Sequence, residues 1–210
     1  MKKLVVFDLD GTLNQTSLYA VPAHKKAMEE FGVTGVSDEM VMKNFGARPV
    51  DYVKFYLPDA DEQTQKAYLE TAGRYENELI QSYHGEFEGT SRMLQKLKAD
   101  GYKTAICSNS SVRYITMVLD ILQLSQYIDY IQPLIPGKIK DDTLQNLLRE
   151  QQPDKAVMVG DRIYDWNAAK ANRIPFIGCG YGYNPAELAG CDFFAETALC
   201  VYDGVKKLIG

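Results

Sequence analysis

The sequence lacks the features that mark disulfide-bonded, membrane-spanning or nucleic-acid-binding proteins. Its 210 residues include only four cysteines, without CxxC or zinc-finger spacing, so we expect reduced thiols rather than a disulfide framework. No apolar run approaches the length of a membrane span, and the run before Asp8 is too short for a signal sequence. The net charge of −5 excludes a global basic surface for nucleic acid or anionic lipid. We therefore expect a cytoplasmic protein that binds neither nucleic acid nor membrane.

The composition and the order of apolar patterns predict an α/β protein. Hydrophobic residues make up 46% and charged residues 24% of the chain, as in ordinary globular proteins. Short β-rich runs alternate with helical patterns, which favours βα units and a Rossmann-like parallel sheet. The predicted strands are residues 4–7, 104–107, 128–131, 156–159, 176–177 and 192–194.

A long interval separates the first two predicted strands and predicts an insertion. It spans nearly a hundred residues without a convincing strand, which is far longer than an ordinary crossover. Aromatic and aliphatic residues recur at helical spacing between residues 68 and 83, indicating a long amphipathic helix. We therefore expect an α/β core domain made of residues 1–14 and 86–210, with residues 15–85 forming an inserted all-helical cap subdomain.

Two carboxylates follow the first predicted strand directly, in the segment Asp8-Leu9-Asp10-Gly11-Thr12. The strand ends of an open α/β sheet are where such proteins bind ligands. One carboxylate can attack an electrophile while its neighbour handles protons, and both can lie near a cation. Taken alone, an Asp-Gly turn is more often structural.

The end of the second strand and a later loop supply candidate anion-binding groups. Ser108-Asn109-Ser110-Ser111 would bring hydroxyls and free N–H groups to a helix start, which suits an anion, although such residues also cap helices. Lys138 and Lys140 precede another predicted helix. Either lysine could neutralise a phosphate or pair with a carboxylate, and the structural alternative is a solvated surface lysine.

The fourth polar site follows the predicted strand at residues 156–159. Asp161 comes at the strand end and Asp165 one helical turn later on the same face. Paired carboxylates at this spacing suit a hard cation such as Mg²⁺, whereas the alternative is a helix cap with an exposed acid. Four such sites in strand-end register favour a joint interpretation as nucleophile, anion pocket, cation and metal ligands.

These residues resemble the motifs of the haloacid dehalogenase superfamily of phosphotransferases. The matches are Asp8-Leu9-Asp10-Gly11-Thr12, then Ser108, then Lys140, then Gly160-Asp161 with Asp165. The predicted helical insertion resembles the C1-type cap of that family. The segments Gly180–Leu188 and Cys191–Phe194 resemble the branch that contains phosphoglycolate phosphatases and β-phosphoglucomutases.

The resemblance implies a role for each of the first-strand carboxylates and for Mg²⁺. Asp8 would be the nucleophile that forms an aspartyl-phosphate. Asp10 would protonate the leaving group and then activate water. The metal would be held by Asp8, Asp161 and the backbone carbonyl of Asp10, with Asp165 in the outer coordination shell.

The resemblance also implies which residues bind substrate. Ser108 and the backbone near Asn109 would bind the phosphoryl oxygens, and Lys140 fits the family's lysine better than Lys138. In the insertion, Arg48 is a candidate for gripping a second anionic group, against the alternative of a solvated structural arginine.

The predicted function is Mg²⁺-dependent hydrolysis of a small phosphate ester such as phosphoglycolate, by a monomer or homodimer. The alternative is a β-phosphoglucomutase-like phosphotransferase. Such mutases carry a cap histidine twelve residues after the nucleophile, where this chain has Ala20, although His24 follows one helical turn later. A more distant alternative is a non-catalytic phosphate-binding or scaffold protein.

Overall fold

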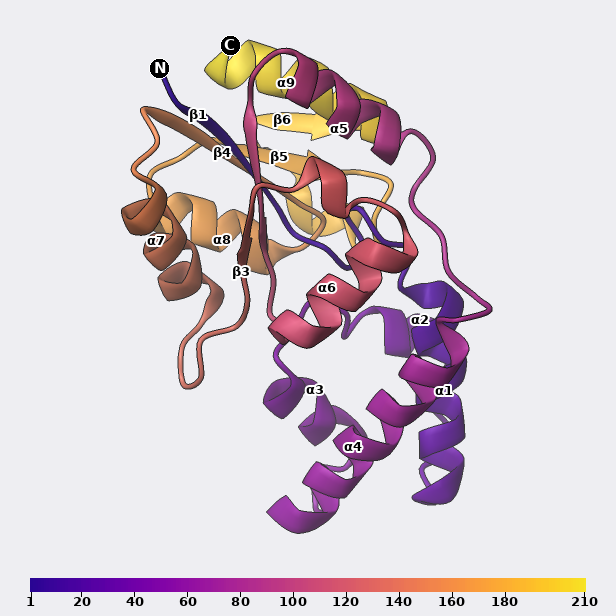
Figure 1. The fold of residues 1–210 in the computed structure, drawn as a ribbon. Helices are drawn as coiled ribbons and strands as arrows, with labels where there is room; N and C mark the ends of the chain where they lie inside the picture. Colours follow the sequence, from indigo (N-terminus) through magenta and orange to yellow (C-terminus); the bar gives the residue numbers. More distant parts are fainter. The chain divides into compact units, whose positions relative to one another are not determined.

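The computed structural model describes all residues from 1 to 210, and the chain divides into two compact units (Figure 1). One unit contains Met1–Asn14 and Glu86–Gly210, and the other contains Gln15–Gly85. The first unit holds every strand of the sheet, and the second is built from helices. None of the helices is long and apolar enough to cross a membrane.

The first unit contains a six-stranded, all-parallel sheet in the order β3-β2-β1-β4-β5-β6. The central position of β1 means that the chain builds the sheet outward in both directions from this strand. The α/β fold with a parallel sheet is therefore confirmed. The strands are β1 (Lys3–Phe7), β2 (Lys103–Cys107), β3 (Tyr130–Gln132), β4 (Lys155–Gly160), β5 (Phe176–Cys179) and β6 (Phe193–Ala195).

Helices cover both faces of this sheet, which explains why its central strands are apolar along their whole length. Leu4 and Val6 face a core built with α7 and α8, while Val5 and Phe7 alternate to the other face. On that face α5 and α9 lie side by side (Figure 1). The helices of this unit are α5 (Thr90–Ala99), α6 (Val112–Ile121), α7 (Lys140–Gln151), α8 (Ile163–Ala171) and α9 (Ala198–Ile209), with short 3₁₀ turns η1 (Ser125–Tyr127) and η2 (Pro185–Leu188).

The third strand begins later than its apolar pattern predicts. The prediction was residues 128–131, but a 3₁₀ turn extends to Tyr127 and the strand starts at Tyr130. The intervening Asp129 uses its carboxylate to accept a 2.9 Å hydrogen bond from the backbone N–H of Thr104. The backbone N–H of Asp129 also donates to the Thr104 carbonyl at 3.0 Å, so Asp129 contacts β2 through both its backbone and its side chain just before β3 begins.

The second unit consists of α1 (Ser17–Glu30), α2 (Asp38–Met42), α3 (Pro49–Tyr56) and α4 (Glu62–Leu79). The long helices α1 and α4 pack against each other. The start of α4 is fixed by Asp61, which accepts a 2.7 Å hydrogen bond from the backbone N–H of Thr64. Tyr83, which shares the helical spacing of residues 68–83, lies beyond the end of α4 and is 58% exposed.

Candidate active site

The polar sites of the sequence meet at the carboxyl edge of the sheet. Asp8 follows β1, Ser108 follows β2 and Asp161 follows β4. Because β2 and β4 flank β1, these three strand ends are neighbours in space. The strand order reverses at β1, and such a reversal is where open parallel sheets bind their ligands.

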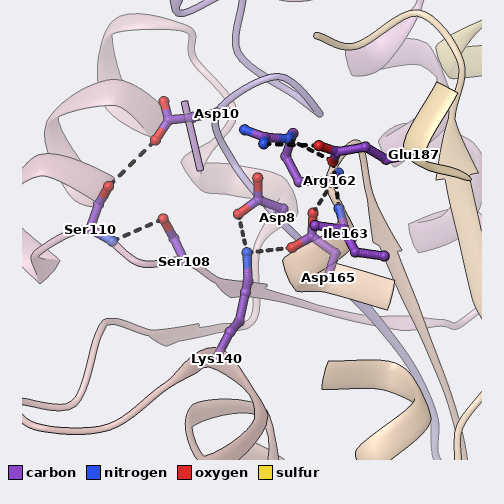
Figure 2. Close-up of polar contacts among 9 residues, drawn as sticks. All are labelled: Asp8, Asp10, Ser108, Ser110, Lys140, Arg162, Ile163, Asp165 and Glu187. Carbon is purple, nitrogen blue, oxygen red and sulfur yellow. Dashed lines mark hydrogen bonds and ion pairs between the residues drawn. The ribbon is translucent and has the colours of Figure 1, made fainter. Parts of the chain in front are cut away.

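Lys140 is the lysine that reaches this edge. It is the first residue of α7 and is 4% exposed, and its Nζ lies 2.5 Å from Asp8 Oδ1 and 2.5 Å from Asp165 Oδ1 (Figure 2). Lys138, in contrast, is exposed. The interpretation of Lys140 as a solvated surface residue is therefore wrong.

Asp8, Asp161 and Asp165 form a buried carboxylate cluster. Each offers an oxygen within 4.8 Å of the others, and none of the three residues is more than 2% exposed. Asp8 Oδ2 and Asp161 Oδ1 are buried without a hydrogen-bond partner. Buried oxygens without donors are costly, and oxygen ligands are what a hard cation such as Mg²⁺ takes. The donor set therefore fits a divalent cation.

Three glycines leave room for these carboxylates. A Cβ on Gly11 or Gly182 would clash with the side chain of Asp161, and one on Gly160 would clash with Asp165. Gly11 also has a φ of +87°, a conformation that favours glycine. The turn after β1, the end of β4 and the loop after β5 thus approach the cluster more closely than any other residue type permits.

Burial dominates the protonation of the cluster. It raises the pKa of Asp8 to about 7; Lys140 opposes this rise, whereas Asp165 and Asp10 add to it. Burial likewise raises the pKa of Asp161 well above its usual range, and the charges of Asp8 and Asp165 add to that effect. Without a cation the site therefore holds its protons unusually tightly.

The ammonium of Lys140 is the compensating charge. Burial by itself would lower the pKa of Lys140, but the carboxylates of Asp165 and Asp8 outweigh it and the pKa is raised. Lys140 therefore stays protonated. Three ionised carboxylates and one ammonium leave two negative charges without compensation, which matches the charge of a divalent cation.

The start of α8 holds Asp165 and Asp161 by different means. The N-cap is Arg162, and Asp165 Oδ2 accepts a 3.0 Å hydrogen bond from the Arg162 backbone N–H. Asp161 Oδ2 accepts instead from the backbone N–H of Tyr183 at 2.9 Å. The alternative of Asp161 as the N-cap beside an exposed Asp165 is therefore wrong. Glu187 completes this region by accepting from the Arg162 guanidinium and the Ile163 N–H (Figure 2).

The loop after β2, for which the sequence predicts an anion corner, leads into the start of α6. Ser108 and Asn109 are buried, and the Ser108 Oγ accepts a 3.2 Å hydrogen bond from the Ser110 N–H. The cap of α6 is Ser111, whose hydroxyl accepts from the Tyr114 N–H at 3.3 Å. Ser111, and not Ser108, therefore caps α6. The Ser108 O–H is not needed for the cap and can donate to a phosphoryl oxygen.

The carboxylate of Asp10 is not part of the cluster. Its Oδ1 accepts hydrogen bonds from Asn14 Nδ2 at 3.0 Å and from the Tyr114 hydroxyl at 2.8 Å. Its Oδ2 accepts from the Ser110 hydroxyl at 3.4 Å (Figure 2). The predicted metal contact of Asp10 concerns its backbone carbonyl and stays a prediction.

The helical unit holds the other two residues that the sequence singles out. Arg48 is half-buried and donates two hydrogen bonds to Asp51, at 2.7 and 3.1 Å. His24 is 3% exposed, with Nδ1 2.9 Å from the Tyr68 hydroxyl and Nε2 3.4 Å from Glu76 Oε1. Both nitrogens of His24 therefore have partners within their own unit.

Sequence reasoning missed Tyr114, Gly182 and Glu187. Tyr114 lies in the first turn of a helix that follows a predicted site, and this position was a usable clue. Gly182 stood out only as part of a segment resembling one family branch. Glu187 lies in η2, within the same segment, and accepts from the Ile163 N–H of α8, a contact that the local sequence does not predict.

The fold and this site together define a class of hydrolase with carboxylates at the switch point of a parallel sheet. The model of the haloacid dehalogenase-like hydrolase family matches residues 5–179. The chain belongs to this family, which confirms the resemblance and the expectation of an enzyme.

Curated relatives agree with this membership, and a solved structure shares the fold. PpaX of Clostridium perfringens is 28% identical over 218 residues, covering 99% of both chains. A phosphoglycolate phosphatase of Aquifex aeolicus is 29% identical over 177 residues, covering 80% of each. The β-phosphoglucomutase structure from Clostridium difficile aligns with a TM-score of 0.82 at 16% identity, covering 99% of this chain and 96% of that one. At that identity the structural likeness concerns the fold alone.

Proposed function

We propose that this protein is a Mg²⁺-dependent phosphatase that hydrolyses a small phosphorylated metabolite through an aspartyl-phosphate. The observation that carries the proposal is the 2.5 Å pairing of Lys140 with Asp8 inside a cluster of three buried carboxylates. A buried carboxylate beside a fixed cation, next to an anion corner, suits phosphoryl transfer, in which positioning and electrostatics supply most of the catalysis. Family membership and a phosphoglycolate phosphatase among the relatives support it.

Asp8, Asp161 and Asp165 would hold the metal, with Asp165 in the outer shell. When bound, Mg²⁺ supplies Lewis-acid polarisation and neutralises phosphoryl charge. The two carboxylate oxygens without donors and the uncompensated charge of the cluster support a divalent cation. Lys140 would keep the Asp8 carboxylate oriented and add a positive charge beside the phosphoryl group.

The chemistry divides between the two carboxylates that follow β1. In the first half, an Asp8 carboxylate oxygen attacks phosphorus, the bond to the leaving oxygen breaks, and Asp10 gives that oxygen its proton. In the second half, water attacks the aspartyl-phosphate, Asp10 takes a proton from the water, and the Asp8–phosphorus bond breaks. The net reaction converts a phosphomonoester and water into an alcohol and phosphate. Ser108 and the N–H groups near Asn109 would hold the phosphoryl oxygens throughout.

The substrate class follows from the family branch and from Arg48. Arg48 would grip a second anionic group, such as the carboxylate of phosphoglycolate, in place of its present partner Asp51. The cap role of residues 15–85 belongs to the same proposal, since it rests on the resemblance. The protein would act on a free metabolite as a monomer or homodimer.

His24 favours the phosphatase over the mutase. A mutase needs a cap histidine that is free to exchange a proton with the sugar hydroxyls. Here His24 is buried, and both of its ring nitrogens are engaged by Tyr68 and Glu76. We therefore expect His24→Asn to lower the thermal stability of the helical unit without a specific loss of phosphatase chemistry.

The test is hydrolysis of p-nitrophenyl phosphate with Mg²⁺, with EDTA, and by Asp8→Asn. We expect turnover that requires Mg²⁺ and that Asp8→Asn abolishes. Phosphoglycolate and β-glucose 1-phosphate are then compared, and release of phosphate from phosphoglycolate supports the phosphatase. Formation of glucose 6-phosphate would instead support the mutase. Folded protein that binds Mg²⁺ but turns over no ester would refute the proposal and favour a binding role.

A further inference from the structure

Arg162 lies in the chain between two carboxylates of the buried cluster, and its side chain pairs with Glu187. Arg162 follows Asp161 directly, and its backbone N–H donates a 3.0 Å hydrogen bond to Asp165 Oδ2. Its guanidinium donates through Nε to Glu187 Oε2 at 3.1 Å and through Nη2 to Glu187 Oε1 at 3.3 Å (Figure 2). Arg162 is 4% exposed. A two-point pair of this kind fixes the direction of both side chains.

Glu187 also binds the backbone on the other side of Arg162. Its Oε2 accepts a 3.0 Å hydrogen bond from the N–H of Ile163, the first residue of α8. The first N–H groups of a helix have no partner within the helix, so a side-chain acceptor here fixes how the helix begins. One carboxylate therefore holds both the Arg162 guanidinium and the peptide group that follows Arg162. A rotation of that peptide group would displace the two carboxylates on either side of it.

The segment that carries Glu187 reaches the cluster at a second place. The backbone N–H of Tyr183 donates to Asp161 Oδ2 at 2.9 Å, and a Cβ at Gly182 would clash with the Asp161 side chain. Glu187 follows these residues in η2. The segment after β5 thus contacts Asp161 itself through its backbone and the start of α8 through Glu187. Both contacts bear on where the cluster places its oxygens.

We propose that Glu187 is a positioning residue that holds Asp161 and Asp165 in the arrangement that binds the divalent cation. Groups that orient metal ligands from outside contribute to metal affinity without touching the metal. Glu187 acts in this way through the Arg162 guanidinium and the Ile163 N–H. The inference rests on the proposed function, because the cation site belongs to that proposal. It assigns a role to a residue outside the carboxylate cluster.

Replacing each partner of the pair in turn separates positioning from long-range charge. Glu187→Ala removes a negative charge, and both effects then weaken Mg²⁺ binding. Arg162→Met removes a positive charge near the cluster, so long-range charge alone would tighten Mg²⁺ binding, whereas lost positioning weakens it. We expect each variant to raise the Kd for Mg²⁺ about tenfold. The measurement is calorimetric titration of Mg²⁺ alone into the metal-free protein.

Asp129→Asn is the matched control for a loss of stability without a loss of site geometry. The Asp129 carboxylate likewise accepts from a backbone N–H, that of Thr104, and from a cationic side chain, that of Lys98, both at 2.9 Å. Thr104 lies near the start of β2, so this pair is at the opposite end of the sheet from the cluster. Asp129→Asn should lower the free energy of unfolding and leave the Kd for Mg²⁺ within about twofold of the wild-type value.

Each outcome bears on the inference. An unchanged Kd for Mg²⁺ in Glu187→Ala, or a lower one in Arg162→Met, would overturn it. If either variant does not fold, Arg162→Lys must raise the Kd, because it keeps the charge but not the two-point geometry, and an unchanged Kd overturns the inference.

The wild type distinguishes this inference from the proposed function. If the wild type does not bind Mg²⁺, the proposed cation site and the role of Glu187 fail together. If the wild type binds Mg²⁺ but hydrolyses no ester, the proposed function fails, and the Kd values of the variants still decide whether Glu187 positions the cation site.

Discussion

Replacing Asp8 with asparagine is expected to stabilise the metal-free protein at neutral and alkaline pH while it abolishes the proposed nucleophile. Asp8 is 2% exposed, and burial raises its pKa from 3.8 to about 7. A folded-state pKa above the unfolded value means that the folded protein binds the proton more tightly. Its contribution to stability is then fully present below pH 3.8 and is lost as the pH rises through about 7.

The magnitude follows from the size of the shift. A rise from 3.8 to about 7, at about 1.4 kcal/mol per pH unit, amounts to about 4 kcal/mol of folding free energy. Asparagine has the same shape and no charge to lose, so Asp8→Asn removes this pH dependence. For a protein of this size, about 4 kcal/mol corresponds to roughly 8–16 °C in the unfolding midpoint.

The assay is urea unfolding of wild type and Asp8→Asn in EDTA, from acidic to alkaline pH. We expect the unfolding free energy of the variant, relative to that of the wild type, to increase by up to about 4 kcal/mol as the pH rises from 3.8 to about 7. Added Mg²⁺ should then stabilise the wild type more than the variant, because the variant lacks one of the ligands. A free-energy difference that is constant with pH would refute the reasoning, since it would mean that ionising Asp8 costs nothing.

Asp129→Asn is a matched control of opposite sign. Burial would raise the pKa of Asp129, but the Thr104 N–H, Lys98 and Lys103 outweigh it and lower the pKa to about 2. The stabilisation by Asp129 is present above pH 3.8 and is lost as the pH falls through about 2. Asp129→Asn should therefore cost about 2 kcal/mol at neutral pH, and the cost should diminish with acidification.

Two further predictions test the site itself. Lys140→Met should lower kcat by about 10²-fold or more. Lys138→Met should leave kcat within about twofold of the wild-type value, because Lys138 is exposed. Steady-state kinetics at saturating Mg²⁺ measures both effects. Gly182→Ala should push Asp161 aside and so reduce the rise in unfolding midpoint that Mg²⁺ produces. The control Gly73→Ala, at an open position in α4, should stabilise the protein by about 0.5–1 kcal/mol and leave the effect of Mg²⁺ unchanged.

The sheet was predictable from the sequence because its strands are short apolar runs bounded by polar segments. β1 and β4 are buried on both faces, so Leu4–Phe7 and residues 156–159 are continuous apolar stretches. The edge strand β3 has only three residues, of which Ile131 is 37% exposed. Just before it, Asp129 bonds to Thr104 through both its backbone N–H and its carboxylate, and no local pattern contains such a long-range contact.

The candidate site was predictable to the extent that each residue follows a strand. Strand ends of a parallel sheet share one edge, so Asp8, Ser108 and Asp161 had to lie near one another once the sheet was predicted. The strand-end argument does not choose between Lys138 and Lys140, because neither lysine directly follows a strand. The choice depends on which lysine begins the helix with its side chain buried. The structure has Lys140 as the first residue of α7, buried against two carboxylates.

The proposed division of labour between Asp8 and Asp10 also draws on the structure, because the sequence shows only two similar carboxylates in one short segment. Asp8 is buried against an ammonium and two further carboxylates, so its charge depends on cations. Asp10 is half-buried and accepts hydrogen bonds from Asn14 in the turn after β1, from Ser110 before α6 and from Tyr114 in α6. A nucleophile must keep an oxygen free of protons, while an acid–base group must gain and lose one. Two such different surroundings would let the neighbouring carboxylates take these two proposed roles.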